Sequence, residues 1–149
     1  MSASVPLPAT DVAHEAPFWE GLREGELRMQ HCSACGRWQF PPLLGCGGCG
    51  GCGRPVAWLR VSGRGTIWSL TEIHPPVLPA FAPLAPYLVA LAELDESPVL
   101  RMVGNVLPAQ GGAINTLRLS DVSIGMKVTA AIEPLGEGVF WPRWRLVPG

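Results

Sequence analysis

Two short cysteine pairs constrain this chain more than any other feature. Cys32 and Cys35 are separated by two residues, and Cys46 and Cys49 repeat that spacing further along. Four thiolates arranged in two such knuckles match the ligand set of a tetrahedral Zn²⁺, and a site with four protein ligands leaves no position for a reactive water. The pattern therefore predicts a zinc ribbon that holds one structural zinc ion.

A fifth cysteine leaves the second pair open. Cys52 follows Cys49 at the same spacing, so the second knuckle can use either Cys46 and Cys49 or Cys49 and Cys52. An iron–sulfur cluster uses the same ligand type. A redox disulfide is a weaker alternative, because these pairs do not open a helix after a strand. Close pairs of this kind in a reducing compartment are typical of metal sites, so we expect a cytoplasmic protein.

One apolar stretch has the length of a membrane span. Residues 73–92 contain no Lys, Arg, Asp or Glu, but five prolines interrupt them, and a continuous helix cannot accommodate five prolines. Residues 1–11 have neither the basic segment nor the apolar core of a signal peptide. We expect no membrane segment.

The rest of the chain predicts a mainly β protein with an N-terminal helical segment. We expect a flexible leader and a helix over 1–30, the zinc ribbon over 31–55 and a barrel over 56–149. The helix is expected near 18–24, with Phe18, Trp19 and Leu22 on an apolar stripe that can pack on its own domain or on another subunit. Five or six short strands after the ribbon favour a small closed barrel, with the OB-fold as the leading candidate. Strands are expected at 27–31, 56–61, 66–74, 87–94, 99–106, 127–132 and 139–146.

Charge argues against a nucleic-acid partner. The formal net charge is −1, and only 15% of residues are charged, against about 25% in an ordinary globular chain. A single-strand-binding barrel combines a basic groove with stacking aromatic side chains, and the charge balance disfavours that groove. A surface this poor in charge instead suggests that a protein partner covers part of it.

Several segments together resemble a known family, the OB-fold acyl-CoA-associated zinc-ribbon proteins first catalogued as a domain of unknown function. The resemblance covers about residues 17–147, and the family's ten-residue gap between knuckles matches Cys35 to Cys46, which favours Cys46 and Cys49 as the second pair. Leu43, where a basic residue is common, and the long loop 105–120 depart from the pattern. The segments are FWEGLREG at 18–25, CSACGRWQFPP at 32–42, CGGC at 46–49, VSGRGTIWS at 61–69, PYLVALAELDE at 86–96 and IGMKV at 124–128.

The resemblance implies a rubredoxin-like ribbon followed by an OB-fold barrel, and an accessory role. Such proteins work beside a thiolase-like protein in acyl-CoA metabolism. The assembled enzyme is an aldolase of steroid side-chain degradation, or a thiolase or acyltransferase. Some members pair with a MaoC-like hydratase. We therefore expect a non-catalytic subunit, in a heteromer such as a dimer of heterodimers, that completes an acyl-CoA pocket. Arg37 and Arg64, both in turns, are the expected contacts to CoA phosphates. The alternatives are a free-standing acyl-CoA-binding scaffold and a single-stranded nucleic-acid-binding OB protein.

Overall fold

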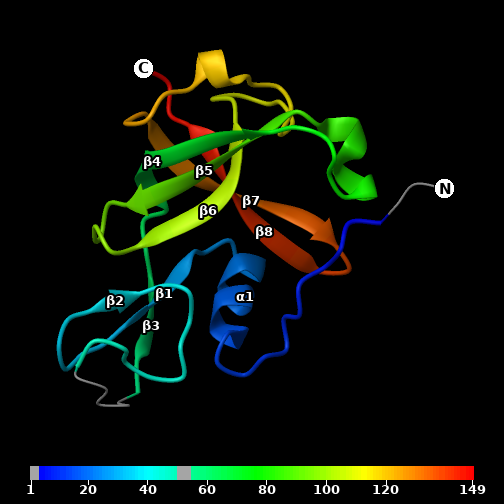
Figure 1. The fold of residues 1–149 in the computed structure, drawn as a ribbon. Helices are drawn as coiled ribbons and strands as arrows, with labels where there is room; N and C mark the ends of the chain where they lie inside the picture. The colour runs from blue at the N-terminus through cyan, green and yellow to red at the C-terminus, as the bar shows by residue number, and fades with distance from the viewer. Residues whose placement is uncertain (1–3, 50–54) are drawn as a thin grey trace.

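The computed structural model describes residues 4–49 and 55–149 (Figure 1). The N-terminal leader runs into helix α1 (Ala16–Arg23), which lies between a small sheet and a barrel. The small sheet carries the cysteine knuckles, and the barrel forms the other end of the molecule (Figure 1).

Helix α1 packs on its own chain. Pro17 occupies the first turn, where the missing N–H has no intrahelical partner to lose. Phe18, Trp19 and Leu22 are all buried. The Phe18 ring lies 5.7 Å from the ring of Phe40, and Trp19 lies 5.9 Å from Trp141 on the barrel, centroid to centroid. The apolar stripe of the helix therefore packs on its own chain and not on another subunit.

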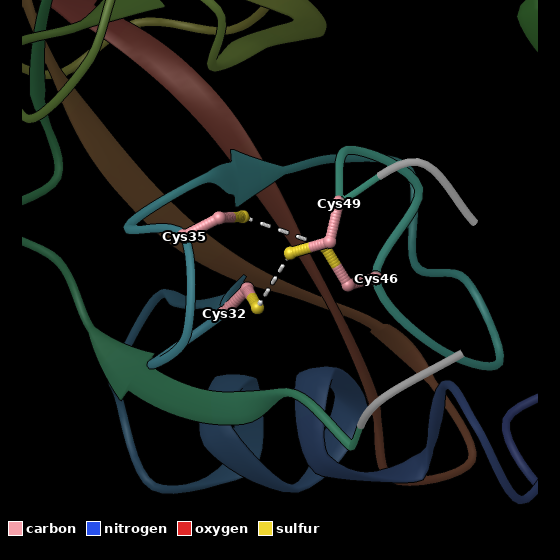
Figure 2. Close-up of side chains that lie close together, drawn as sticks. All are labelled: Cys32, Cys35, Cys46 and Cys49. Carbon is pink, nitrogen blue, oxygen red and sulfur yellow. Dashed lines mark hydrogen bonds between the residues drawn. The ribbon is translucent and has the colours of Figure 1, made fainter. Parts of the chain in front are cut away.

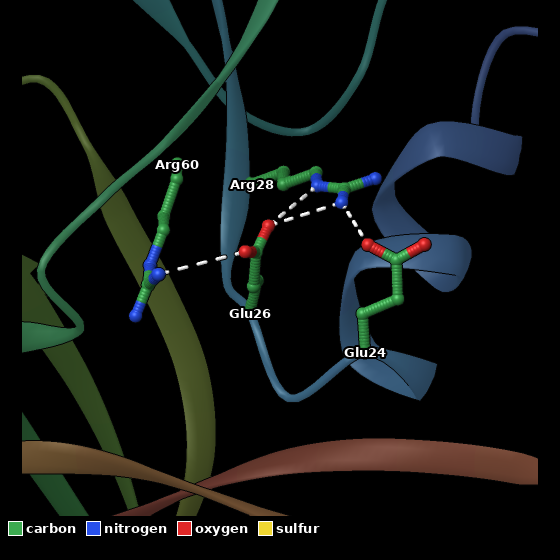
Figure 3. A network of polar contacts seen from close by, with 4 residues as sticks. All are labelled: Glu24, Glu26, Arg28 and Arg60. Atoms are coloured by element: carbon green, nitrogen blue, oxygen red, sulfur yellow. Dashed lines mark hydrogen bonds and ion pairs between the residues drawn. The ribbon is translucent and has the colours of Figure 1, made fainter.

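A charged network fastens the end of this helix to the small sheet (Figure 3). Arg28 contacts the carboxylates of Glu24 and Glu26, and its Nε lies 3.0 Å from Glu26 Oε2. Arg60 reaches the other oxygen of Glu26 at 3.5 Å. The stem of Arg28 also lies against Gly21, where a Cβ would come within 2.9 Å of it. The glycine in the helix thus makes room for the arginine that anchors it.

The small sheet has three short antiparallel strands in the order β2-β1-β3. They are β1 (Arg28–His31), β2 (Trp38–Gln39) and β3 (Ala57–Arg60). The expected strand at 56–61 contains β3, which pairs with β1 from Arg28↔Arg60 to His31↔Ala57 and not with a barrel strand. The sequence pattern had not indicated β2.

The remaining five strands close into a barrel in the order β4-β5-β6-β8-β7, with β7 pairing back to β4. Among the described barrel strands, β6 and β8 pair in parallel and the other neighbours pair antiparallel. The sequence predicted an OB-fold barrel of five to six strands, and the described residues form a closed barrel of five. The strands are β4 (Arg64–Ile73), β5 (Tyr87–Leu94), β6 (Arg101–Leu107), β7 (Lys127–Gly136) and β8 (Val139–Leu146), and two 3₁₀ turns, η1 (Pro79–Leu84) and η2 (Leu119–Asp121), lie in the connections.

The barrel core is made by alternate residues of its strands. Every second residue of β5 is buried, as a strand with one face on a core requires. Trp144 fills the interior with no exposed surface and donates from Nε1 to the carbonyl oxygen of Met102 at 3.0 Å. Gly65 permits β4 and β5 to approach, because a Cβ there would lie 2.5 Å from the carbonyl oxygen of Glu93.

The charge-free stretch 73–92 does not form a long helix. It comprises the end of β4, the short turn η1 and most of β5. Within 4–49 and 55–149, no helix has the length and apolar character needed to cross a membrane.

Candidate metal centre

Four cysteine sulfurs converge at one end of the small sheet (Figure 2). Cys32 and Cys35 lie in the turn between β1 and β2, and Cys46 and Cys49 lie in the loop after β2. Cys32 Sγ is 3.7 Å from Cys49 Sγ. Cys35 Sγ is 3.6 Å from Cys46 Sγ, which is 3.5 Å from Cys49 Sγ. Sulfurs placed about 2.3 Å from one tetrahedral Zn²⁺ are about 3.8 Å apart, so the cluster fits a single zinc ion.

Backbone N–H groups favour the thiolate form at this cluster. Gly48 N lies 3.3 Å from Cys46 Sγ, and this hydrogen bond lowers the pKa of Cys46 to about 6. The backbone N–H of Cys35, followed by that of Ala34, lowers the pKa of Cys32. Zinc binds thiolates, so the backbone N–H groups of both knuckles stabilise the form of the cysteines that binds the ion.

Two buried glutamines hold the second knuckle in place, and the sequence analysis missed them. Gln39 Nε2 donates to Gln30 Oε1 at 2.7 Å and to the carbonyl oxygen of Gly45 at 3.1 Å, and Gln39 Oε1 accepts from Gly47 N at 3.2 Å. Gln30 exchanges two hydrogen bonds with the backbone of Leu43, at 2.8 and 2.9 Å. The Gln39 carboxamide therefore bonds to the main chain on both sides of Cys46. Single glutamines leave no periodic signal that would have revealed this role.

The cluster has the character of a structural site. Four cysteines are positioned for one ion, and Cys32 and Cys46 are buried whereas Cys35 is exposed. Such a set fills the tetrahedron with protein ligands and supplies no Lewis-acid position for a substrate. The neighbouring His31 packs against the ring of Trp38, centroids 4.7 Å apart, and is not in the sulfur group. Cys52 lies outside the described residues.

The two arginines proposed for CoA lie on different elements. Arg37 is exposed on the approach to β2, and its side chain lies over the second knuckle, where a Cβ at Gly48 would clash with it. Arg64 is the first residue of β4, with its side chain 72% exposed and its Nε 3.8 Å from Asp95 Oδ2. Both side chains are exposed, and Arg64 already has an acidic neighbour in Asp95.

Three further arginines that could line a nucleic-acid groove already have acidic partners. Arg60 contacts Glu26, and Arg143 lies 3.0 Å from Glu133. The second oxygen of Glu133 lies 3.8 Å from Arg145. Paired cations of this kind do not form the open basic track that single strands require.

The ribbon and the barrel together define a zinc-ribbon OB-fold protein. Family models match both parts: the rubredoxin-like zinc ribbon domain of ChsH2 matches residues 19–55, and the C-terminal OB-fold domain of ChsH2 matches residues 58–133. The chain therefore belongs to the ChsH2 family, which confirms the resemblance that its motifs indicated.

Two curated relatives are CoA hydratase subunits. The 3-oxo-4,17-pregnadiene-20-carboxyl-CoA hydratase alpha subunit of Mycobacterium tuberculosis is 31% identical over 129 residues, which are 87% of this chain and 35% of that protein. A probable enoyl-CoA hydratase alpha subunit of Thermomonospora curvata is 34% identical over 101 residues, 67% of this chain and 30% of that protein. The chain thus spans about a third of the length of these relatives.

Two solved structures share the fold. A chain of the Ltp2–ChsH2(DUF35) aldolase superposes with a TM-score of 0.76 and 28% identity, covering 94% of this chain and 98% of that one. A DUF35-family protein of unknown function from Sulfolobus solfataricus superposes with a TM-score of 0.56 and 17% identity, covering 91% and 86%. The second likeness concerns the fold alone.

Proposed function

We propose that this chain is a non-catalytic subunit that associates with a thiolase-like protein to form an acyl-CoA enzyme that cleaves or forms C–C bonds. An aldolase of steroid side-chain degradation is the favoured activity, and a thiolase or acyltransferase is the alternative. The observation that carries the proposal is the full-length likeness to a chain of the Ltp2–ChsH2(DUF35) aldolase. The name of the mycobacterial relative, a steroid carboxyl-CoA hydratase subunit, supports the same substrate class.

The metal site supports an accessory role. Its four cysteines face one another, so the zinc ion stabilises the ribbon and takes no part in the reaction. We propose Cys32, Cys35, Cys46 and Cys49 as the ligands of that ion. A cytoplasmic setting, which keeps thiols reduced, suits this ligand set.

Exposed apolar side chains support a protein partner. Leu78, before η1, is 58% exposed, and Ile124, before β7, is 68% exposed. The surrounding segment 75–86 has no charged residue, and depletion of charge is typical of an interface centre. We propose that this segment contacts the thiolase-like protein, in an assembly such as a dimer of heterodimers. Arg37 and Arg64 remain proposed contacts for CoA phosphates, and a MaoC-like hydratase remains a proposed further partner.

The decisive test is co-expression with a thiolase-like protein of the Ltp2 type. We expect a stable complex by size-exclusion chromatography and mass photometry, and acyl-CoA cleavage only when both chains are present. Leu78→Arg should weaken the complex, whereas Val147→Arg, at the C-terminal end, should not. A partner that is soluble and fully active alone would refute the proposal. If no complex forms and this chain still binds acyl-CoA, the free-standing scaffold is favoured; acyl-CoA binding by a chain that also forms the complex is compatible with the subunit role.

A further inference from the structure

A hollow of 430 Å³ lies beneath the N-terminal leader. Residues 5–8 of the leader form one wall, and Phe81, Leu135 and Trp141 from η1, β7 and β8 contribute apolar side chains to the others. Figure 1 shows the leader passing beside the β7–β8 hairpin. The volume falls in the range of about 300–1,000 Å³ that is typical of small-molecule sites.

The leader is attached to the barrel only by apolar contact. Val5, Leu7 and Pro8 are half-buried there. Along the described chain, no hydrogen bond joins residues 4–11 to the barrel. A segment held in this way opens at low cost, so a ligand can enter the hollow without disturbing the strands.

Two polar groups lie side by side in the hollow. Val106 on β6 pairs with Trp144 on β8, so Asn105 and Arg143, one residue earlier on each parallel strand, face the same side of the sheet. The described residues offer the Asn105 carboxamide no hydrogen-bond partner. Arg143, whose side chain is 16% exposed, lies with Nε 3.0 Å from Glu133 Oε2, and its terminal nitrogens remain available. The hollow is thus lined mainly by apolar side chains, with the hydrogen-bond donors of Asn105 and Arg143 grouped on β6 and β8.

We propose that this hollow binds the acyl group of a carboxylic acid derivative, with its carbon chain or rings against Leu7, Phe81 and Trp141 and its carbonyl oxygen accepting from Asn105 and Arg143. Glu133 is shared between Arg143 and Arg145 but lies nearer to Arg143, at 3.0 Å against 3.8 Å, so Arg143 is the better neutralised of the two and can donate to a neutral thioester carbonyl. The thioester source rests on the proposed function, whereas binding of the acyl group does not.

The test uses the full zinc-loaded chain and isothermal titration calorimetry with decanoyl-CoA, decanoate and CoA alone. We expect decanoyl-CoA to bind most tightly, decanoate more weakly and CoA alone least. Leu135→Trp, which fills the hollow, should abolish acyl-dependent binding, whereas the matched Leu119→Trp on exposed η2 should not. Asn105→Leu should weaken decanoyl-CoA binding about fivefold, as expected for one lost hydrogen bond, and Asn115→Leu should leave it unchanged.

Removal of residues 2–9 should weaken binding about tenfold through loss of the apolar wall. The inference is overturned if neither acyl compound binds, or if both bind equally well to the Leu135→Trp variant with its melting temperature intact. Tighter binding of decanoate than of decanoyl-CoA would overturn the thioester source. Complex formation with the thiolase-like protein is measured separately, so failure of acyl binding leaves that test unaffected.

Discussion

Replacing Gln39 tests whether the buried amides hold the zinc knuckle. The side chain is 7% exposed and makes three hydrogen bonds, two of them to the main chain on either side of Cys46. Gln39→Leu keeps the volume but leaves Gly45 O and Gly47 N unpaired. At about 1 kcal/mol for each net hydrogen bond, the loss is about 3 kcal/mol.

Part of that loss should appear as weaker metal binding, because folding of a zinc ribbon is coupled to its ion. We expect the zinc affinity of Gln39→Leu to fall about 10- to 100-fold, measured by competition with a chromogenic chelator. Gln110→Leu, on an exposed loop, is the control and should match the parent chain. The reasoning fails if Gln39→Leu keeps its zinc affinity within about threefold and unfolds at the same denaturant concentration.

Three further changes test the core and the metal site. Trp144→Ala should lower the free energy of unfolding by about 3–5 kcal/mol in denaturant titrations, because the ring is wholly buried; a loss below about 1 kcal/mol would contradict this packing. Gly65→Ala should cost about 1–3 kcal/mol in the same assay, since its Cβ would meet the Glu93 carbonyl, and an unchanged midpoint would show that the strands can separate there. Because the pKa of Cys46 is lowered, to about 6, its thiolate stabilises the fold fully above the ordinary thiol range, and this contribution is lost as the pH falls through about 6. The apparent zinc affinity, measured by chelator competition, should therefore weaken further as the pH falls below about 6, because protons then compete with zinc for Cys46, and an affinity that does not change across that range would contradict the prediction.

Local patterns in the sequence predicted most of the fold. The strand predicted at 87–94 has the bounds of β5, a largely apolar run of which every second residue is buried. Pairing between distant strands left no such signal. The expected strand at 56–61 was found, but nothing local indicates that β3 joins β1, since that choice depends on where the knuckles bring the chain back. Strand β2 has two residues, too few for any periodicity.

In the candidate metal centre, too, one part could be predicted from the sequence and another part could not. Cysteine spacing predicted the zinc ribbon because the chemistry of the ion fixes both the type and the number of its ligands. The supporting glutamines could not be predicted, because an amide side chain acts through whichever backbone groups the fold places beside it. Gln30 and Gln39 come from paired strands, opposite each other in the register, and only that pairing makes them neighbours.

The zinc ion and the hollow beneath the leader are connected through packed elements. The ion holds the knuckles, the two glutamines join the second knuckle to β1 and β2, and the Arg28 network joins β1 to α1. Helix α1 in turn packs Trp19 against Trp141, which lines the hollow. We expect removal of the ion to loosen the first of these contacts and to weaken the support of β1 beneath the helix. We therefore expect the fluorescence of a chain whose emission is dominated by Trp141, and the affinity of the proposed acyl ligand, to change when zinc is removed with a chelator.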